Sequence, residues 1–204
     1  MSPEIEQISS IKSEKRSTGI IGLDFQLGGG IPKGKSTILY GDALSGCDIL
    51  AEQFWHADDS KKSTYLMIDG LIKEGMTDAE EMNPESLFNA MEGNWIVVDS
   101  LSSVIIKYGI DASVSFLEKC MSAIKENEAN ILFLMYPDIH TPAEEAKIIR
   151  HSDIFITLSN TLHGNEIERS LTINKISGAD VPKRAYPYNI LSGGIELSTT
   201  GRVV

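Results

Sequence analysis

Short apolar runs alternate with amphipathic segments through the first two thirds of the chain, and these runs have the length of buried strands. Strands that are covered on both faces are continuously apolar, and strands that alternate with helices form parallel sheets. The pattern therefore predicts an α/β fold whose mainly parallel central sheet is flanked by helices. The predicted strands cover residues 36–40, 63–69, 94–99 and 131–135.

Helices are predicted between these strands, most clearly over residues 47–57 and 113–127, where apolar side chains recur every three or four positions. Further helix starts are predicted where a side chain can cap the first backbone amides of a helix. These starts are Thr77 in Thr77-Asp-Ala-Glu80, Asn83 in Asn83-Pro-Glu85, and Thr141 in Thr141-Pro-Ala-Glu144.

The last third of the chain has no comparable helical pattern. Residues 153–158 and 170–175, and the short runs on either side of Gly193 and Gly194, have the composition of strands. We therefore expect C-terminal antiparallel strands at an edge of the sheet.

The composition indicates one globular domain and limits its partners. Of the 204 residues, 42% are hydrophobic and 23% are charged, and no linker rich in Pro, Gly or Ser divides the chain. We expect an N-terminal arm over residues 1–17 and a single domain over residues 18–204. With 18 Lys and Arg against 29 Asp and Glu, the net charge of −11 argues against nucleic acid as a partner.

Membrane and metal-binding signals are absent from the sequence. No apolar run approaches the ~20 residues that a membrane-spanning helix needs, and the N-terminus is polar. The two cysteines are too few for a disulfide framework or a zinc site, and the four histidines are scattered. We therefore expect a cytoplasmic protein without a bound metal.

Polar residues and glycines follow the predicted parallel strands. Gly41, Asp69, Asp99 and Tyr136 lie at the ends of the four strands. In parallel α/β folds the ligand crevice lies at the carboxyl ends of the strands. A crevice is therefore expected where these four residues meet.

The segment from Gly41 to Asp48 joins a predicted strand to a predicted helix, which is the setting of a phosphate-binding P-loop. A P-loop reads glycine, four residues, glycine, lysine, and serine or threonine. Gly41 and Gly46 keep this spacing, with Ser45 between them, but Cys47 stands at the lysine position and Asp48 at the hydroxyl position. The loop therefore lacks the cation that contacts phosphates and the hydroxyl that binds magnesium.

The glycine spacing of this loop and its Asp48 each have a second interpretation. Two glycines at this spacing also fit an ordinary tight turn between a strand and a helix. The charge of Asp48 could complement the helix dipole by ~0.3–1 kcal/mol. Alternatively, its carboxylate could act as an internal anion that accepts the backbone amides that a phosphate would use.

Segments around the loop carry a more specific pattern: Thr18-Gly-Ile-Ile-Gly-Leu-Asp24, Leu27-Gly-Gly-Gly-Ile-Pro-Lys-Gly34, and Ile96-Val-Val-Asp-Ser-Leu-Ser-Ser103. With these segments the chain resembles the RecA-like ATPases of the KaiC/RadA branch, and looks most like small archaeal single-domain KaiC-like proteins, including the archaellum accessory ATPase. The resemblance implies a RecA-like P-loop NTPase fold. It also implies assembly with RecA/KaiC-like subunits as a homo- or hetero-oligomer.

The resemblance also implies roles for individual residues. Asp99 matches the Walker B aspartate, which orders magnesium through water in active members, and its alternative role is to cap a turn. Lys175 matches the first of two basic residues that face a neighbouring subunit's nucleotide, and its alternative is a solvated strand-end lysine. The second basic position is Ser177, and the acidic pair expected after the second strand is replaced by Asp69-Gly-Leu-Ile72.

Four parts of an ATPase site are therefore altered: the lysine, the magnesium hydroxyl, the catalytic glutamate and the second basic residue. Loss of one electrostatic donor can lower a rate by ~10²–10³, so we predict no useful ATP hydrolysis. The predicted function is that of a pseudo-ATPase that acts as a regulatory or scaffold subunit through protein partners. No cofactor is expected, and ATP with magnesium would bind weakly at most. The alternative is a nucleotide-binding protein or slow ATPase with an atypical P-loop, because backbone amides contribute much of phosphate binding.

Overall fold

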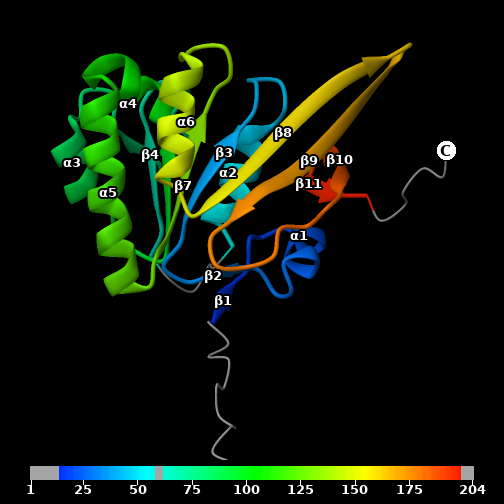
Figure 1. Ribbon diagram of the computed structural model, residues 1–204, viewed down its shortest axis with the longest axis horizontal. Coiled ribbons are helices and arrows are strands. Elements are labelled where there is room, and N and C mark those ends of the chain that lie inside the picture. The colour runs from blue at the N-terminus through cyan, green and yellow to red at the C-terminus, as the bar shows by residue number, and fades with distance from the viewer. Residues whose placement is uncertain (1–13, 58–61, 199–204) are drawn as a thin grey trace, which may run out of the picture.

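The computed structural model describes residues 14–57 and 62–198 of the chain. Within these ranges, nine strands form one sheet in the order β11-β10-β9-β8-β3-β7-β6-β4-β5, and β1 (Lys15–Arg16) pairs with β2 (Ile31–Pro32) apart from it (Figure 1). The parallel part contains β3 (Ser36–Tyr40), β4 (Thr64–Met67), β5 (Thr77–Asp78), β6 (Trp95–Asp99), β7 (Asn130–Met135) and β8 (Ile154–His163). The antiparallel part adds β9 (Glu166–Ile176), β10 (Ala185–Leu191) and β11 (Gly194–Leu197). The predicted α/β sheet with C-terminal antiparallel strands is confirmed.

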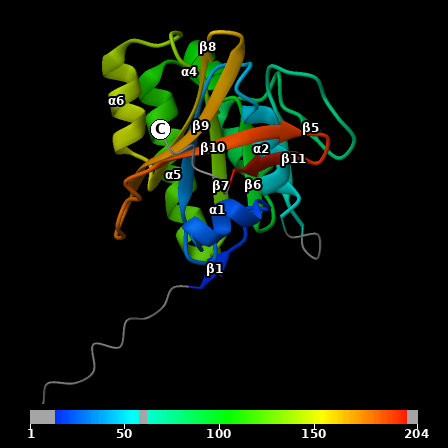
Figure 2. The same ribbon diagram turned by 90° about the vertical axis from the view of Figure 1, so that its right-hand side faces the viewer.

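Helices cover both faces of the sheet (Figures 1 and 2). Residues of α1 (Ile21–Gln26) and α2 (Cys47–Trp55) belong to the apolar cluster on one face. The other face is covered by α3 (Pro84–Asn89), α4 (Leu101–Tyr108), α5 (Ile110–Asn127) and α6 (Pro142–Arg150). Neighbouring residues of β3 face opposite clusters, as Leu39 and Ile38 do, so the central strands are apolar throughout.

Two of the three predicted helix starts are confirmed and one is wrong. Asn83 accepts a hydrogen bond from the Ser86 amide at the start of α3, and Thr141 forms a reciprocal capping box with Glu144 at the start of α6. At Thr77 no helix begins: Thr77 and Asp78 form β5 and pair with Leu66 and Met67 of β4. The Asp78 carboxylate accepts from the Glu80 amide at 3.2 Å in a turn, so a side-chain cap is present without a helix.

The C-terminal strands are longer than the apolar runs that predicted them. β8 and β9 form a hairpin of ten and eleven residues, whereas the pairing of β9 with β10 stops at Ser170 and Pro187. The end of the hairpin therefore continues past the sheet as a two-stranded ribbon (Figure 1). We call residues 160–168 the hairpin tip.

The N-terminal segment is tied to the sheet by an arginine. Arg16 on β1 donates from Nη1 to the Glu128 carbonyl and to Asn130 Oδ1, each at 2.8 Å, and is buried. Residues 1–13 of the expected arm lie outside the described residues. Residues 15 and 16 are β1 and pack with the domain.

The last strand of the sheet is held by a side chain from α2. Gln53 Nε2 donates to the Ile195 carbonyl at 3.2 Å, and the Ile195 amide donates to Gln53 Oε1 at 2.7 Å. Gly194 has a φ of 116°, and a Cβ there would lie 2.6 Å from Gln53 Cδ. Only glycine therefore leaves room for this pair of hydrogen bonds.

Replacing Gln53 with leucine is expected to lower the free energy of unfolding by about 1–3 kcal/mol, because it leaves the amide and carbonyl of Ile195 without partners. Urea denaturation followed by circular dichroism measures the loss. Gln53→Glu keeps the acceptor for the Ile195 amide and loses the donor to the Ile195 carbonyl, so it measures the second bond apart from the first. Equal stability of Gln53→Leu and wild type would show that the two bonds contribute nothing.

Candidate functional site

The loop between β3 and α2 packs tightly against Gly41, its first glycine. Ser45 Oγ and Cys47 Sγ lie 3.3 Å apart, and a Cβ on Gly41 would meet them at 2.6 and 2.8 Å. Gly46 ends the loop with a φ of 84°, and α2 begins at Cys47. Burial is the main cause that raises the pKa of Cys47 to about 12, so the side chain at the lysine position is a neutral packed thiol.

An aspartate does bind the loop from within, but it is Asp42 rather than Asp48. Asp42 Oδ1 accepts from the Leu44 amide at 2.7 Å, and the Asp42 carbonyl accepts from the Ser45 amide at 3.0 Å and the Ser45 hydroxyl at 2.6 Å. Asp48 is exposed in the first turn of α2. The internal-anion hypothesis for Asp48 was therefore wrong, and its place beside the helix amides fits the dipole interpretation.

The loop is also fixed from the antiparallel part of the sheet. Tyr188 on β10 donates its hydroxyl to the Ser45 carbonyl at 2.6 Å. Asn160, at the base of the hairpin tip, donates to Asp42 Oδ1 at 3.2 Å. Two segments more than a hundred residues away thus set the conformation of the loop.

Asp99 ends β6 beside the loop and is held by two tyrosines. Its carboxylate is 3% exposed and accepts from the hydroxyls of Tyr65, at 2.7 Å, and Tyr136, at 3.3 Å. Burial is the largest cause that raises its pKa to about 6; the two hydroxyls lower it, whereas the charges of Asp69 and Asp48 raise it further. Asp99 is therefore mainly ionised at neutral pH, and its buried charge lowers the free energy of unfolding there.

Serines that follow Asp99 hold a second carboxylate. Ser100 donates to Asp69 Oδ2 at 2.7 Å, and Ser103 donates to the same oxygen. The Ser102 hydroxyl accepts from the Tyr136 amide at 3.0 Å and contacts His140 Nε2 at 3.0 Å. These contacts join the ends of β4, β6 and β7, as the strand-end positions predicted, although the partners themselves could not be assigned from the sequence.

These strand ends and α2 enclose a cavity of about 570 Å³. Among the described residues, four carboxylates and one lysine line it, and this lysine, Lys73, is paired with one of the carboxylates, Glu52. The lining residues are Ala43, Cys47, Asp48, Glu52, Tyr65, Met67, Asp69, Gly70, Leu71, Lys73, Asp99 and Tyr136. The predicted crevice is thus present, and its charged groups favour a cation over an anion.

Lys175 lies away from this cavity. Its Nζ donates to the carbonyls of Ile149, at 2.7 Å, and of Arg150 and Ser152, at the end of α6. A lysine at this place complements the negative end of the helix dipole. Within this chain, Lys175 therefore holds α6 against β9 and does not join the other predicted site residues.

No group of three or more His, Cys, Asp or Glu side chains in residues 14–57 and 62–198 is arranged to hold a metal ion. The four carboxylates of the cavity are spread around it rather than gathered on one point. In the same part of the chain no helix has the length and apolar character needed to cross a bilayer.

Comparison with known proteins gives a family and a fold. The model of a family described only as a family of unknown function (DUF7125) matches residues 15–192. No curated protein matches the chain. A solved structure of the KaiC-like protein PH0186 from the hyperthermophilic archaeon Pyrococcus horikoshii OT3 superposes with a TM-score of 0.74 at 16% identity, over 91% of this chain and 99% of that one. The chain therefore belongs to the DUF7125 family and has a KaiC-like, RecA-type fold.

Proposed function

We propose that this chain is a pseudo-ATPase, a RecA-type domain that acts as a regulatory or scaffold subunit by binding other proteins. The observation that carries the proposal is the charge of the cavity: Asp48, Glu52, Asp69 and Asp99 line it, and the one lysine that lines it in the described part of the chain is bound to Glu52. A triphosphate placed there would face carboxylates where catalytic sites supply cations.

The loss of phosphate stabilisation does not depend on Cys47 alone. Asp48 lies in the first turn of α2, where the helix amides attract anions, and it offsets that attraction. Asp99 carries its negative charge at neutral pH because its pKa is about 6. Each of these three side chains weakens one part of phosphate stabilisation. Cys47 and Asp48 lie on α2 and Asp99 lies on β6, so no single neighbouring residue compensates for all three.

Protein partners follow from the fold rather than from the cavity. The KaiC-like fold is consistent with assembly into oligomers, so RecA/KaiC-like subunits, either copies of this chain or relatives, are the proposed partners. A subunit without a working site would leave one interface of such an assembly inactive.

Nucleotide titration tests the proposal. Calorimetry of the wild type with Mg-ATP is expected to show no measurable binding, and the phosphate released is expected to stay at background. Cys47→Lys with Asp48→Thr adds a charge-assisted hydrogen bond and removes a like charge, so this variant should bind ATP with an affinity at least about tenfold above the detection limit of the wild-type titration. Cys47→Ser with Asp48→Asn is the matched control, because it removes the negative charge without adding a cation.

Tight binding of Mg-ATP by the wild type, with turnover, contradicts the proposal. Thermal melting of each variant is measured alongside, because Cys47 is buried and a lysine there must reach the cavity.

A nucleotide-binding protein or slow ATPase is the second candidate, and one observation favours it. Within residues 14–57 and 62–198, no side chain caps the first amides of α2, so these amides can donate to an anion. In that case the wild type would bind ADP and ATP weakly, and Asp48→Asn alone would strengthen binding. The titration above separates the two candidates.

A further inference from the structure

The hairpin tip exposes a pair of apolar side chains far from the core. Leu162 and Ile167 face each other across β8 and β9, and they are 68% and 56% exposed. In the part of the chain that the structure describes, the tip has no third strand beside it, because β10 pairs only as far as Ser170. A two-stranded ribbon is marginally stable in water on its own, so this ribbon gains from contact with another surface.

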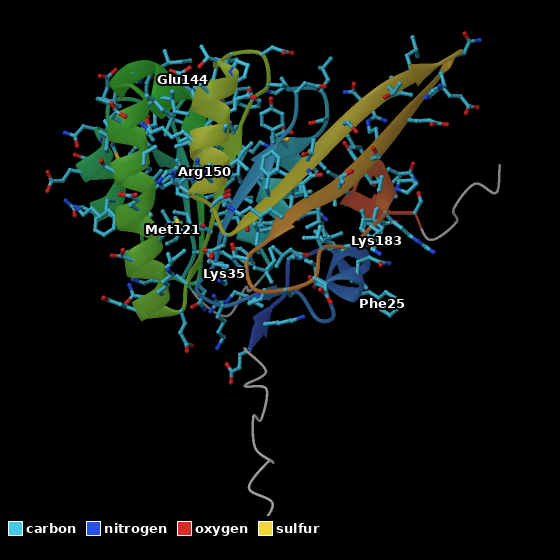
Figure 3. All side chains as sticks on the ribbon, viewed as in Figure 1. Phe25, Lys35, Met121, Glu144, Arg150 and Lys183 are labelled. Carbon is cyan, nitrogen blue, oxygen red and sulfur yellow. The ribbon has the colours of Figure 1, made fainter. Side chains whose placement is uncertain are left out.

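A second apolar surface is open on α1. A groove of about 600 Å³ runs between α1 and β10, lined by Ile21, Phe25, Tyr186, Pro187 and Leu197 among others. Ile21 and Phe25 are 89% and 80% exposed. Figure 3 shows Phe25 on the outer side of α1, below Lys183. We call this surface the α1 groove.

The two surfaces have opposite charge. The tip carries Glu166 and Glu168 beside its apolar pair, with His163 Nε2 3.6 Å from Glu168 Oε2. Among the described residues, the charged one that lines the α1 groove is Arg184, which follows the exposed Lys183. Complementary charges around an apolar contact select a partner and orient it. An acidic tip with two aliphatic side chains therefore matches an apolar groove with a basic rim.

The tip cannot reach the α1 groove of its own copy. Figures 1 and 2 agree that the tip and α1 lie at opposite ends of the antiparallel part of the sheet. Contact between the two surfaces therefore requires two molecules.

We propose that the hairpin tip of one copy of this chain binds the α1 groove of a second copy. Leu162 and Ile167 pack against Phe25 and Ile21, while the glutamates of the tip face Lys183 and Arg184. Such a head-to-tail contact leaves one tip and one groove free at the ends, so it builds rings or open chains of subunits. The inference rests on the proposed function in that it names the partner as a second copy.

The experiment measures association by sedimentation velocity without nucleotide. The wild type is expected to form oligomers as its concentration rises. Phe25→Glu, which blocks the groove, and Leu162→Ser with Ile167→Ser, which removes the tip's apolar pair, should each weaken association by about 30-fold or more. Ile106→Ser is the matched control, because Ile106 is 65% exposed on α4, outside both surfaces.

Mixing the two blocked variants gives the decisive result. The Phe25→Glu copy keeps its tip and the tip variant keeps its groove, so the mixture should form a one-to-one dimer although neither variant associates alone. A wild type that stays monomeric at every concentration, a mixture without the dimer, or an equal loss in Ile106→Ser would each overturn the proposal.

Charge reversal provides a test that leaves the apolar surfaces unchanged. Arg184→Glu should weaken association, and adding Glu168→Lys to the same chain should restore it. Failure of the restored variant to associate better than Arg184→Glu counts against the proposed orientation. Tight binding of Mg-ATP with turnover would refute the pseudo-ATPase function and leaves these nucleotide-free measurements unchanged, so the two proposals fail separately.

Discussion

Replacing Asp99 with asparagine is expected to make the protein more stable at neutral pH, by on the order of 3 kcal/mol. Burial and the charges of Asp69 and Asp48 raise the pKa of Asp99 from 3.8 to about 6. The folded protein therefore holds this proton over a pH range where the unfolded chain has released it. The stability contributed by the protonated carboxyl is complete below pH about 4 and is lost as the pH rises through about 6.

Asparagine carries no charge at any of these pH values, so it removes the cost of the buried carboxylate. Urea denaturation between pH 4 and pH 8 measures the effect: the two proteins should be nearly equal at pH 4 and diverge up to pH 7. Asp111→Asn is the control, because Lys147 lowers the pKa of the exposed Asp111, and its contribution has the opposite sign. If Asp99→Asn were less stable than wild type at pH 7, the hydrogen bonds from Tyr65 and Tyr136 would outweigh the cost of the charge.

The second large effect is expected at Trp95, whose replacement by alanine should lower the free energy of unfolding by about 3–5 kcal/mol. Trp95 is fully buried at the start of β6 and packs on Phe54 of α2, with ring centroids 5.2 Å apart. Its indole N–H donates to the Ser17 carbonyl at 3.2 Å. One side chain thus joins the sheet, α2 and the N-terminal segment, and alanine would leave a cavity among all three.

Urea denaturation followed by far-ultraviolet circular dichroism is the appropriate measurement, because the substitution also removes one of two tryptophan fluorophores. Trp95→Phe retains most of the packing but lacks the indole N–H, so its free energy of unfolding should fall by only about 1 kcal/mol. A loss of that small size in Trp95→Ala would mean that the surrounding core collapses into the space.

The sequence could predict the parallel strands because burial on both faces imposes a continuous apolar run. Residues 36–40 and 131–135 show this directly, since each strand contributes to the clusters on both sides of the sheet. The apolar pattern did not reveal α4, which begins at Leu101 with Ser100 as its N-cap directly after β6, and the capping pattern at Thr77 could not be told from a turn. The hairpin tip was missed because its exposed residues carry no burial pattern.

The site was predictable in position but not in its contacts. Because parallel strands end together, the sequence predicted one edge of the sheet for four residues: Gly41, Asp69, Asp99 and Tyr136. Tyr65 was not predicted as a site residue, because it lies within β4 rather than at its end. In the structure it pairs with Val97, two residues before Asp99, and its hydroxyl donates to the Asp99 carboxylate. Register between strands depends on packing across the whole sheet and cannot be derived from local sequence.

The hydrogen bonds of Gln53 also bear on how the protein behaves at high concentration. Terminal strands of open sheets can template amyloid-like stacking of one molecule on the next, because their free amides and carbonyls accept another backbone. Here the terminal strand β11 has four residues, and the amide and carbonyl of its second residue are already bound by a side chain. Backbone-to-backbone polymerisation is thereby disfavoured at this end of the sheet, so strand pairing through β11 adds little to any association between molecules.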